Sequence, residues 1–340
     1  MEVMIGIDPH KGSHTAVAID TEEVIIDKLQ VSASTAQTTV LLGWADRFDE
    51  RRWAVESAAG LGYLLSQQLV AAGEEVLDVP AVLAARVRVL DTNCSQKNDP
   101  NDARSVAVAA LRAGRLRSVR PDDHARVLRL LAKRHRDLGR QKNKAACRIH
   151  ALLLDLTPGG AAAPMTVTRA NAIFDAIDTT DAMSRHRVEL GRELVADMAR
   201  FEAQMKTSTH RIRQAVEASG TSLTEIYGCG PICAAMILGH TGDIERFATR
   251  AHYASYNATA PNEASSGPRP RHRVNLRGNR QLNWAIHMIA DPQIRHRDTR
   301  GRAYYARMID EGKTGKEALR ALKRRISDVV YRHLVADARR

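Results

Sequence analysis

The 340-residue sequence contains few cysteines and has no long apolar run. Since no stretch approaches about 18 consecutive apolar residues, we expect no transmembrane helix. The first residues enter a strand-like segment directly, so we also expect no secretory leader. The four cysteines lack the paired spacing of a metal site, which favours free thiols in a reducing compartment; they are Cys94, Cys147, Cys229 and Cys233.

Positive charge is abundant and unevenly distributed along the chain. The net charge is +12, and residues 103–150 contain 14 Lys/Arg against 3 Asp/Glu, while residues 268–340 contain 19 against 7. Clustered Lys and Arg attract phosphate backbones with little dependence on base sequence, although a solvated helix face is the alternative. Two such stretches favour a nucleic-acid partner. Aromatic residues make up only 4%, so we expect backbone contact rather than base stacking.

The first third of the chain alternates strand and helix patterns. Three strand-like segments come first, followed by strand, helix, strand and helix. This order predicts an α/β domain with a mixed sheet, compatible with a ribonuclease-H-like fold. The predicted strands are 3–8, 14–19, 24–31, 53–56 and 75–79.

From about residue 101 the pattern becomes helical. A basic helix or helix pair is predicted over 122–155, and a second long helix over 182–217. The apolar residues of the second helix have heptad-like spacing, which fits a coiled-coil arm or an amphipathic helix packed on its own domain. The remainder is mostly α-helical, interrupted by a Gly/Pro/Ser/Arg-rich loop at 261–278. We therefore divide the chain into 1–150, 151–220 and 221–340.

Four carboxylates stand where strands end or a helix begins. Asp8 ends the first strand and Glu56 a later one, and side chains at the carboxyl ends of strands point into the ligand-binding crevice of an α/β sheet. Asp99 and Asp102 lie three residues apart at a helix start. Carboxylates suit Mg²⁺, and two ions about 4 Å apart can clamp a phosphoryl displacement.

Each acid also has a structural alternative. Asp99 before Pro100 is a good N-cap, and Asp102 then suits the helix dipole. Asp8 could be a turn residue, and Glu56 could pair with an arginine. The combination favours a metal site, because four acids facing one interior would repel one another without a cation.

Two further segments could contact phosphates. Gly228 and Gly230 permit a tight turn before a helix that starts at Pro231, which resembles a helix–hairpin–helix but also fits a plain turn between packed helices. Downstream, Ser265 and Ser266 precede a glycine in a cationic loop. A serine there could attack a phosphate, although these residue types are also ordinary in a linker.

In their order along the chain, these motifs resemble the insertion-sequence-110 transposases. The segments Ile5-Gly6-Ile7-Asp8-Pro9-His10-Lys11, Val55-Glu56-Ser57 and Lys97-Asn98-Asp99-Pro100-Asn101-Asp102-Ala103 are similar to the family's DEDD motif. The family's second, serine-bearing domain is resembled by Gly228-Cys229-Gly230-Pro231, Gly242-Asp243, Ala260-Pro261, Ser265-Ser266-Gly267 and Arg277-Gly278-Asn279. The resemblance covers nearly the whole chain. It departs at Asn98, where Thr or Ser is common, and after Glu56, where Thr-Gly is usual.

The resemblance implies a RuvC-like first domain whose metal ligands are Asp8, Glu56, Asp99 and Asp102, with Mg²⁺ as the cofactor. It implies Ser266 as the nucleophile, with Ser265 in reserve, forming a covalent link to DNA in a site completed by acids of another subunit. The implied partners are donor and target DNA, a guide (bridge) RNA and further copies of the chain. The copies would form a homodimer through the coiled-coil arm, and then a tetramer.

The resemblance and the charge pattern together predict where nucleic acid is bound and where the protein acts. We expect a cytoplasmic protein associated with the nucleoid. The expected nucleic-acid contacts are Lys11, Gly228, Gly230, Arg269, Arg271, Arg273, Arg277 and Asn279.

Three other functions compete with the transposase interpretation. A RuvC-like Holliday-junction resolvase needs the four acids but no serine, and a non-catalytic DNA-bridging protein needs neither. A sugar-kinase or actin-like ATPase is suggested by Gly6-Ile7-Asp8 followed by Lys11-Gly12-Ser13. That fold requires a second phosphate loop and a Gly-rich adenosine site. The sole Gly-Gly pair, Gly159-Gly160, follows a basic helix rather than a strand, which disfavours this reading.

Overall fold

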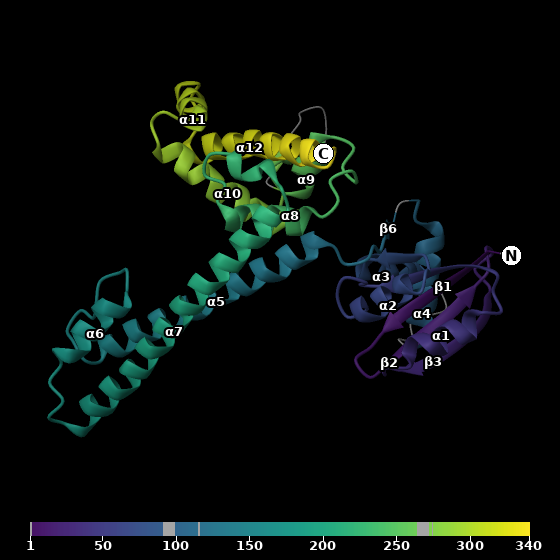
Figure 1. The fold of residues 1–340 in the computed structure, drawn as a ribbon, viewed down its shortest axis with the longest axis horizontal. Helices are drawn as coiled ribbons and strands as arrows, with labels where there is room; N and C mark the ends of the chain where they lie inside the picture. Colours follow the sequence, from purple (N-terminus) through teal and green to yellow (C-terminus); the bar gives the residue numbers. More distant parts are fainter. Residues whose placement is uncertain (1, 91–98, 115, 264–271, 274) are drawn as a thin grey trace. The chain divides into compact units, whose positions relative to one another are not determined.

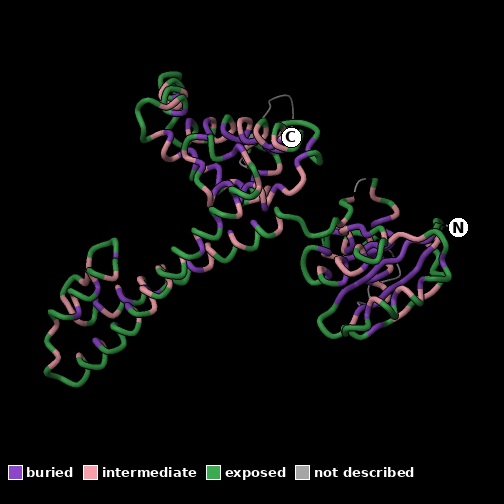
Figure 2. The backbone as a smooth tube through the Cα atoms, viewed as in Figure 1, coloured by how far each residue is buried: buried purple, intermediate pink, exposed green. Residues whose placement is uncertain are grey.

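The computed structural model describes residues 2–90, 99–114, 116–263, 272–273 and 275–340. The chain forms two compact units, Met1–Asp122 and Asp123–Arg340 (Figure 1). Each unit has its own buried apolar core, as expected of a domain that folds around its own interior (Figure 2).

The first unit is built on a mixed six-stranded sheet with the order β3-β2-β1-β4-β5-β6. The first three strands pair antiparallel, β4 and β5 continue parallel to β1, and β6 closes the edge antiparallel to β5. The predicted α/β domain with a mixed sheet is confirmed. The strands are β1 Glu2–Pro9, β2 Ser13–Ile19, β3 Ile25–Ser32, β4 Glu50–Glu56, β5 Val76–Val79 and β6 Arg117–Ser118.

Helices cover both faces of this sheet, because its central strands are apolar on both sides. In β1, Val3, Ile5 and Ile7 pack into one core cluster, whereas Met4 packs into the other. The first cluster is covered by α1 (Gln37–Ala45) and α2 (Tyr63–Ala71), and the second by α3 (Ala81–Leu90) and α4 (Asp99–Arg112). Residues two apart in a strand share a face, so the even-numbered positions of β1 face α4.

The second unit begins with two long helices that lie side by side (Figure 1). These are α5 (His124–Leu154) and α7 (Ala182–Ala218), with α6 (Val167–Asp175) between them in the chain. Ile149 and Leu153 of α5 share a buried cluster with Val195 and Met198 of α7. The partner of the predicted heptad face is therefore α5 of the same chain, which is the packing expected of an amphipathic helix on its own domain. Pairing between chains remains a prediction.

The rest of the second unit is a helical domain around α8 (Pro231–Thr241), which is buried along most of its length. Its core also includes Leu128 from α5, which the sequence pattern groups with residues 1–150. The three-part division of the chain remains a prediction. The other elements are η1 Ser222–Glu225, α9 Arg250–Tyr256, β7 Asn262–Glu263, β8 His272–Arg273, α10 Arg280–Arg295, α11 Arg300–Asp310 and α12 Gly315–Asp337.

The helices and the cysteines of the described residues can be compared with the predictions from the sequence. Among the described residues, every helix is too short or too polar to cross a membrane. Cys147, Cys229 and Cys233 are free thiols, as predicted, and Cys94 lies outside the described residues.

Candidate metal centre

Two parallel strands bring Asp8 and Glu56 to the same end of the sheet. In the pairing of β1 with β4, Ile7 lies opposite Val55, and the two acids follow these residues directly. Asp8 continues the face of Met4, and Glu56 continues the face of Ala54, which packs in the same cluster. Both carboxylates therefore belong to the α4 side of the sheet.

Gly6 lets α4 approach these strands closely enough to add Asp99 and Asp102. A Cβ atom at Gly6 would lie 2.2 Å from the backbone oxygen of Ala103 and 2.5 Å from the backbone nitrogen of Ala107. These backbone atoms cannot move aside without displacing the helix. The glycine of the Gly6-Ile7-Asp8 segment thus has a packing role that places the first turn of α4 next to Asp8.

The other three predicted acids lie near enough to Asp8 for their charges to act on it. The pKa of Asp8 is raised to about 6, mainly because burial disfavours the charged carboxylate. Glu56, Asp102 and Asp99 raise it as well through charge repulsion, whereas His10 acts in the opposite direction. The site carries a surplus of negative charge that a bound cation would relieve.

Asp8, His10 and Asp99 form the tightest part of this site. Two carboxylate oxygens and one imidazole nitrogen lie within 4.8 Å of one another, and Asp8 is buried while His10 is exposed. Carboxylate oxygens suit Mg²⁺, and an added imidazole is also accepted by Mn²⁺ and other transition metals. The donor set therefore fits a divalent cation. His10 is absent from the predicted ligand set, although its position two residues after a strand-end acid was a usable signal.

Asp102 is engaged by an arginine that the sequence did not single out. Nη1 of Arg88, near the end of α3, forms an ion pair with Oδ1 of Asp102. This contact raises the pKa of Arg88, and the charges of Glu56 and Asp8 contribute in the same direction. Nothing in the sequence pattern marks Arg88, because the pair depends on how α3 packs against α4.

The predicted serine nucleophile lies outside the described residues, together with Arg269 and Arg271. The two strands that bracket this segment are described, and they pair antiparallel with Glu263 opposite His272. Arg273 in the second strand is exposed. The catalytic role of Ser266 or Ser265 remains a prediction.

The other predicted nucleic-acid contacts have mixed surroundings. Lys11 is exposed between β1 and β2, and Arg277 is exposed in the turn before α10. Asn279 caps α10, because its side chain accepts hydrogen bonds from the backbone nitrogens of Gln281 and Leu282 at 3.0 and 3.2 Å. Together, Arg277 and Asn279 border a cleft of about 630 Å³. Their contact with nucleic acid remains a prediction.

The glycine turn before α8 is explained at one position by packing. Gly228 has a φ of 86°, and a Cβ there would lie 2.9 Å from the backbone oxygen of Ile289 in α10. This close contact fits a plain turn between packed helices. Gly230 precedes Pro231 at the start of α8 and has open space around its Cα hydrogen. A helix–hairpin–helix role in binding DNA remains a prediction.

Comparisons with known proteins match both parts of the chain. Residues 5–158 match a transposase family model for the DEDD domain of IS110 elements, and residues 220–306 match the model described as "Transposase IS116/IS110/IS902 family". The IS116 protein of Streptomyces clavuligerus is 26% identical, over 97% of this chain and 94% of its own length. The IS110 protein of Streptomyces coelicolor is also 26% identical, over 97% and 93%. Thermus thermophilus RuvC in complex with a Holliday junction aligns over 35% of this chain and all of its own, with 17% identity and a TM-score of 0.29.

The two matched models lie in the order of the motifs, the first around the acid cluster and the second around the glycine turn and the serine segment. They define a transposase, a class of enzyme that acts on DNA. The chain belongs to the IS110 family of insertion-element transposases.

Proposed function

We propose that this transposase cleaves and rejoins DNA strands under the guidance of a bridge RNA. The observation that carries the proposal is the convergence of Glu56, Asp99 and Asp102 on the buried Asp8, in a chain of the IS110 family. The same convergence supports metal-dependent phosphoryl transfer over a purely DNA-bridging role, because a bridging protein has no need of clustered acids that repel one another.

The acid cluster would hold Mg²⁺, in one or two ions, through Asp8, Asp99 and the neighbouring acids. A cation bound there would stabilise the negative charge that develops on the phosphoryl oxygens. His10 lies close enough to Asp8 and Asp99 to act as a further ligand. With Arg88 paired to Asp102, the chain supplies a positive charge at this site even without a metal.

Ser266, or Ser265 in reserve, would act as the nucleophile. Its hydroxyl oxygen would form a bond to a backbone phosphorus while the bond from that phosphorus to the leaving strand oxygen breaks. The serine proton passes to the leaving oxygen, directly or through solvent. Attack by a hydroxyl of another strand on the serine-linked phosphate reverses the step and rejoins the DNA.

Basic surfaces of the second unit would hold the nucleic acids. Helix α5 alone exposes six lysine and arginine side chains, and exposed arginines recur toward the C-terminus. We propose donor DNA, target DNA and the bridge RNA as ligands and further copies of the chain as partners, first in a dimer and then in a tetramer. Acting on chromosomal DNA, the protein would work in the cytoplasm at the nucleoid. The exposed lysines and arginines of α5 are Arg129, Lys133, Arg134, Arg140, Lys144 and Arg148.

Trapping of covalent protein–DNA adducts tests this function. With donor DNA, guide RNA and Mg²⁺, we expect an adduct with the wild-type protein and none with the Ser265→Ala, Ser266→Ala double variant. An adduct that persists in the double variant contradicts the serine chemistry. Cleavage without any adduct, abolished only by Asp8→Asn, would instead favour the resolvase-like alternative.

A further inference from the structure

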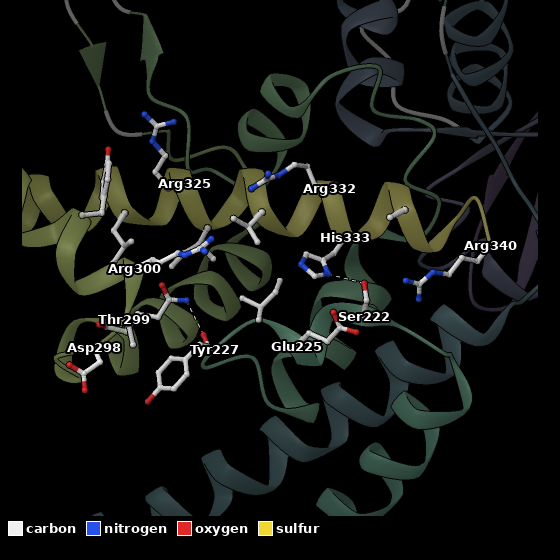
Figure 3. Close-up of a pocket in the computed structure, with 18 residues that line it drawn as sticks. Ser222, Glu225, Tyr227, Asp298, Thr299, Arg300, Arg325, Arg332, His333 and Arg340 are labelled. Carbon is white, nitrogen blue, oxygen red and sulfur yellow. Dashed lines mark hydrogen bonds between the residues drawn. The ribbon is translucent and has the colours of Figure 1, made fainter.

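The second unit contains a large cleft away from the segments that the proposed strand chemistry uses. It has a volume of about 880 Å³ and lies between the chain from Ser222 to Tyr227, the turn between α10 and α11, and one face of α12 (Figure 3). This volume is within the range of about 300–1,000 Å³ that small-ligand sites occupy.

The cleft combines an apolar floor with a cationic rim. Ile226, Leu322 and Ile326 are buried beneath it. The rim carries more cationic than anionic side chains, so it attracts phosphate groups. The charged lining residues are Arg300, Arg325, Arg332, Arg340, Glu225 and Asp298.

The four arginines differ in whether another side chain of the protein already contacts them. Arg340 lies 3.7 Å from Asp337, and Arg325 lies over the ring of Tyr304 with 5.5 Å between the guanidinium carbon and the ring centre. Within the part of the chain that the structure describes, the guanidinium groups of Arg300 and Arg332 form no ion pair or hydrogen bond. Their charges are therefore available for a ligand.

His333 adds a further polar group, and its hydrogen bonds fix its orientation. The hydroxyl of Ser222 lies 2.8 Å from Nδ1 of His333 (Figure 3). The same hydroxyl lies 2.7 Å from Oδ1 of Asp337. An ionised carboxylate only accepts hydrogen bonds, so Ser222 donates to Asp337 and accepts from His333 Nδ1–H. The Ser222 proton is thus directed away from His333, which excludes a serine-hydrolase triad, and Nε2 is left for the cleft.

The wall that carries Tyr227 is held in place by Gln293. Nε2 of Gln293 donates to the backbone oxygen of Tyr227 at 2.8 Å, and the hydroxyl of Thr299 donates to the backbone oxygen of Gln293 at 2.5 Å. Gly301 packs against Gln293 so closely that a Cβ would lie 2.3 Å from its Oε1. These contacts fix Tyr227 at the edge of the cleft while leaving 48% of it exposed.

We propose that this cleft binds an unpaired segment of single-stranded nucleic acid, with phosphates at Arg300 and Arg332 and a base against Tyr227 and the apolar floor. The proposal rests on the proposed function, which requires unpaired strands. A duplex keeps its bases stacked inside and offers the cleft only phosphates, whereas an unpaired strand offers phosphates and base faces together. Two of the seven tyrosines, Tyr227 and Tyr304, line this one cleft, although aromatic residues are scarce in the chain as a whole.

Binding of short fluorescent oligonucleotides to the full-length protein tests the proposal. The probes are an oligouridine, an oligothymidine and a mixed-sequence duplex of the same length, measured by anisotropy at several salt concentrations. For the Arg300→Gln, Arg332→Gln double variant, we expect single-strand affinity to fall about 10-fold or more and the salt slope to fall by roughly 1.5, since two phosphate contacts are lost. Duplex binding should change less than about twofold, because phosphate contacts elsewhere carry it.

Two further variants distinguish binding in the cleft from a general effect of positive charge on nucleic-acid affinity. The Arg320→Gln, Arg339→Gln variant removes the same charge from exposed positions outside the cleft lining and should leave single-strand binding within about twofold of wild type. Tyr227→Ala should weaken single-strand binding by about 5-fold or more, and Tyr227→Phe should restore it, because stacking needs the ring rather than the hydroxyl. If the cleft variants lose affinity for oligouridine alone, the occupant is RNA. If they lose affinity for both oligouridine and oligothymidine, the cleft accepts any unpaired strand.

Equal weakening of single-strand and duplex binding by the cleft variant, or weakening no greater than in the control variant, overturns the proposal. Photo-crosslinking of a 4-thiouridine oligonucleotide to the wild-type protein gives a result that does not depend on a variant folding. A crosslinked peptide containing Tyr227 is expected, and crosslinks confined to other peptides contradict the proposal. Neither measurement requires strand cleavage. A negative binding or crosslinking result would therefore contradict the cleft proposal without bearing on the serine chemistry. A missing protein–DNA adduct would contradict the serine chemistry without changing these binding results.

Discussion

Replacing Asp8 by asparagine removes a charge that is unfavourable in the folded protein without metal. A rise in pKa from 3.8 to about 6 corresponds to roughly 3 kcal/mol against the ionised form, and partial solvent screening reduces this to about 1–3 kcal/mol. Because the folded state holds the proton more tightly than the unfolded state, this cost is absent below about pH 4 and complete above about pH 6. Asp8→Asn should therefore raise the free energy of unfolding at pH 8 and leave it nearly unchanged at pH 4.

Urea unfolding in EDTA, followed by tryptophan fluorescence, measures this effect in the first unit. Trp284 lies in the second unit, so a Trp284→Phe background leaves Trp44 and Trp53 as reporters of the sheet domain. Mg²⁺ should then stabilise the Asp8-containing protein, by about 1.4 kcal/mol at a ten-fold excess over its dissociation constant, and stabilise the Asp8→Asn variant less.

Asp20→Asn is the matched control for this experiment. Asp20 accepts hydrogen bonds from the backbone nitrogens of Glu22 and Val24 in an exposed turn, so its replacement should lower stability slightly and leave the effect of Mg²⁺ unchanged. The reasoning fails if Asp8→Asn is no more stable than its parent at pH 8 in EDTA, or if it gains as much at pH 4.

Two other substitutions test how the metal centre is assembled. Gly6→Ala should destabilise the first unit by about 3 kcal/mol or more in the same urea assay, because the new methyl group meets the backbone of α4. The control is Gly12→Ala, which should leave the stability nearly unchanged because Gly12 is exposed and has open space around it. Arg88→Gln should strengthen Mn²⁺ binding by several-fold in calorimetry, since it frees Asp102 and removes a repelling charge, while it lowers stability in EDTA. Unchanged or weaker Mn²⁺ binding in Arg88→Gln would show that the Arg88–Asp102 pair does not compete with the metal.

The local patterns of the sequence predict the sheet domain well. Apolar runs and period-two alternation mark each of β1 to β5, and the acids fall at strand ends because Asp8 and Glu56 directly follow buried apolar residues. Side-chain period and strand direction are properties of neighbouring residues, so they can be read before the fold is known.

The features that the sequence did not predict depend on contacts between distant residues. The pairing of Arg88 with Asp102 requires the packing of α3 on α4, and the role of Gly6 becomes visible only when α4 lies on β1. Likewise, the heptad spacing in α7 predicts that this helix packs against an apolar partner but does not identify the partner. In the structure the partner is α5. Tyr227 joins a cleft whose other walls come from residues about 70 to 110 positions further along the chain.

Strand cleavage by the full-length protein, supplied with its guide RNA, donor DNA and Mg²⁺, tests the central claim most directly. We expect the wild-type protein to cut only when a divalent cation is present. Asp8→Asn should slow cleavage by at least about 100-fold while DNA and RNA binding stay within about twofold of wild type, because the acid acts on the reacting phosphate rather than on binding. Cleavage in EDTA, or cleavage by Asp8→Asn at the wild-type rate, would contradict the assignment of the acid cluster as the metal centre of this transposase.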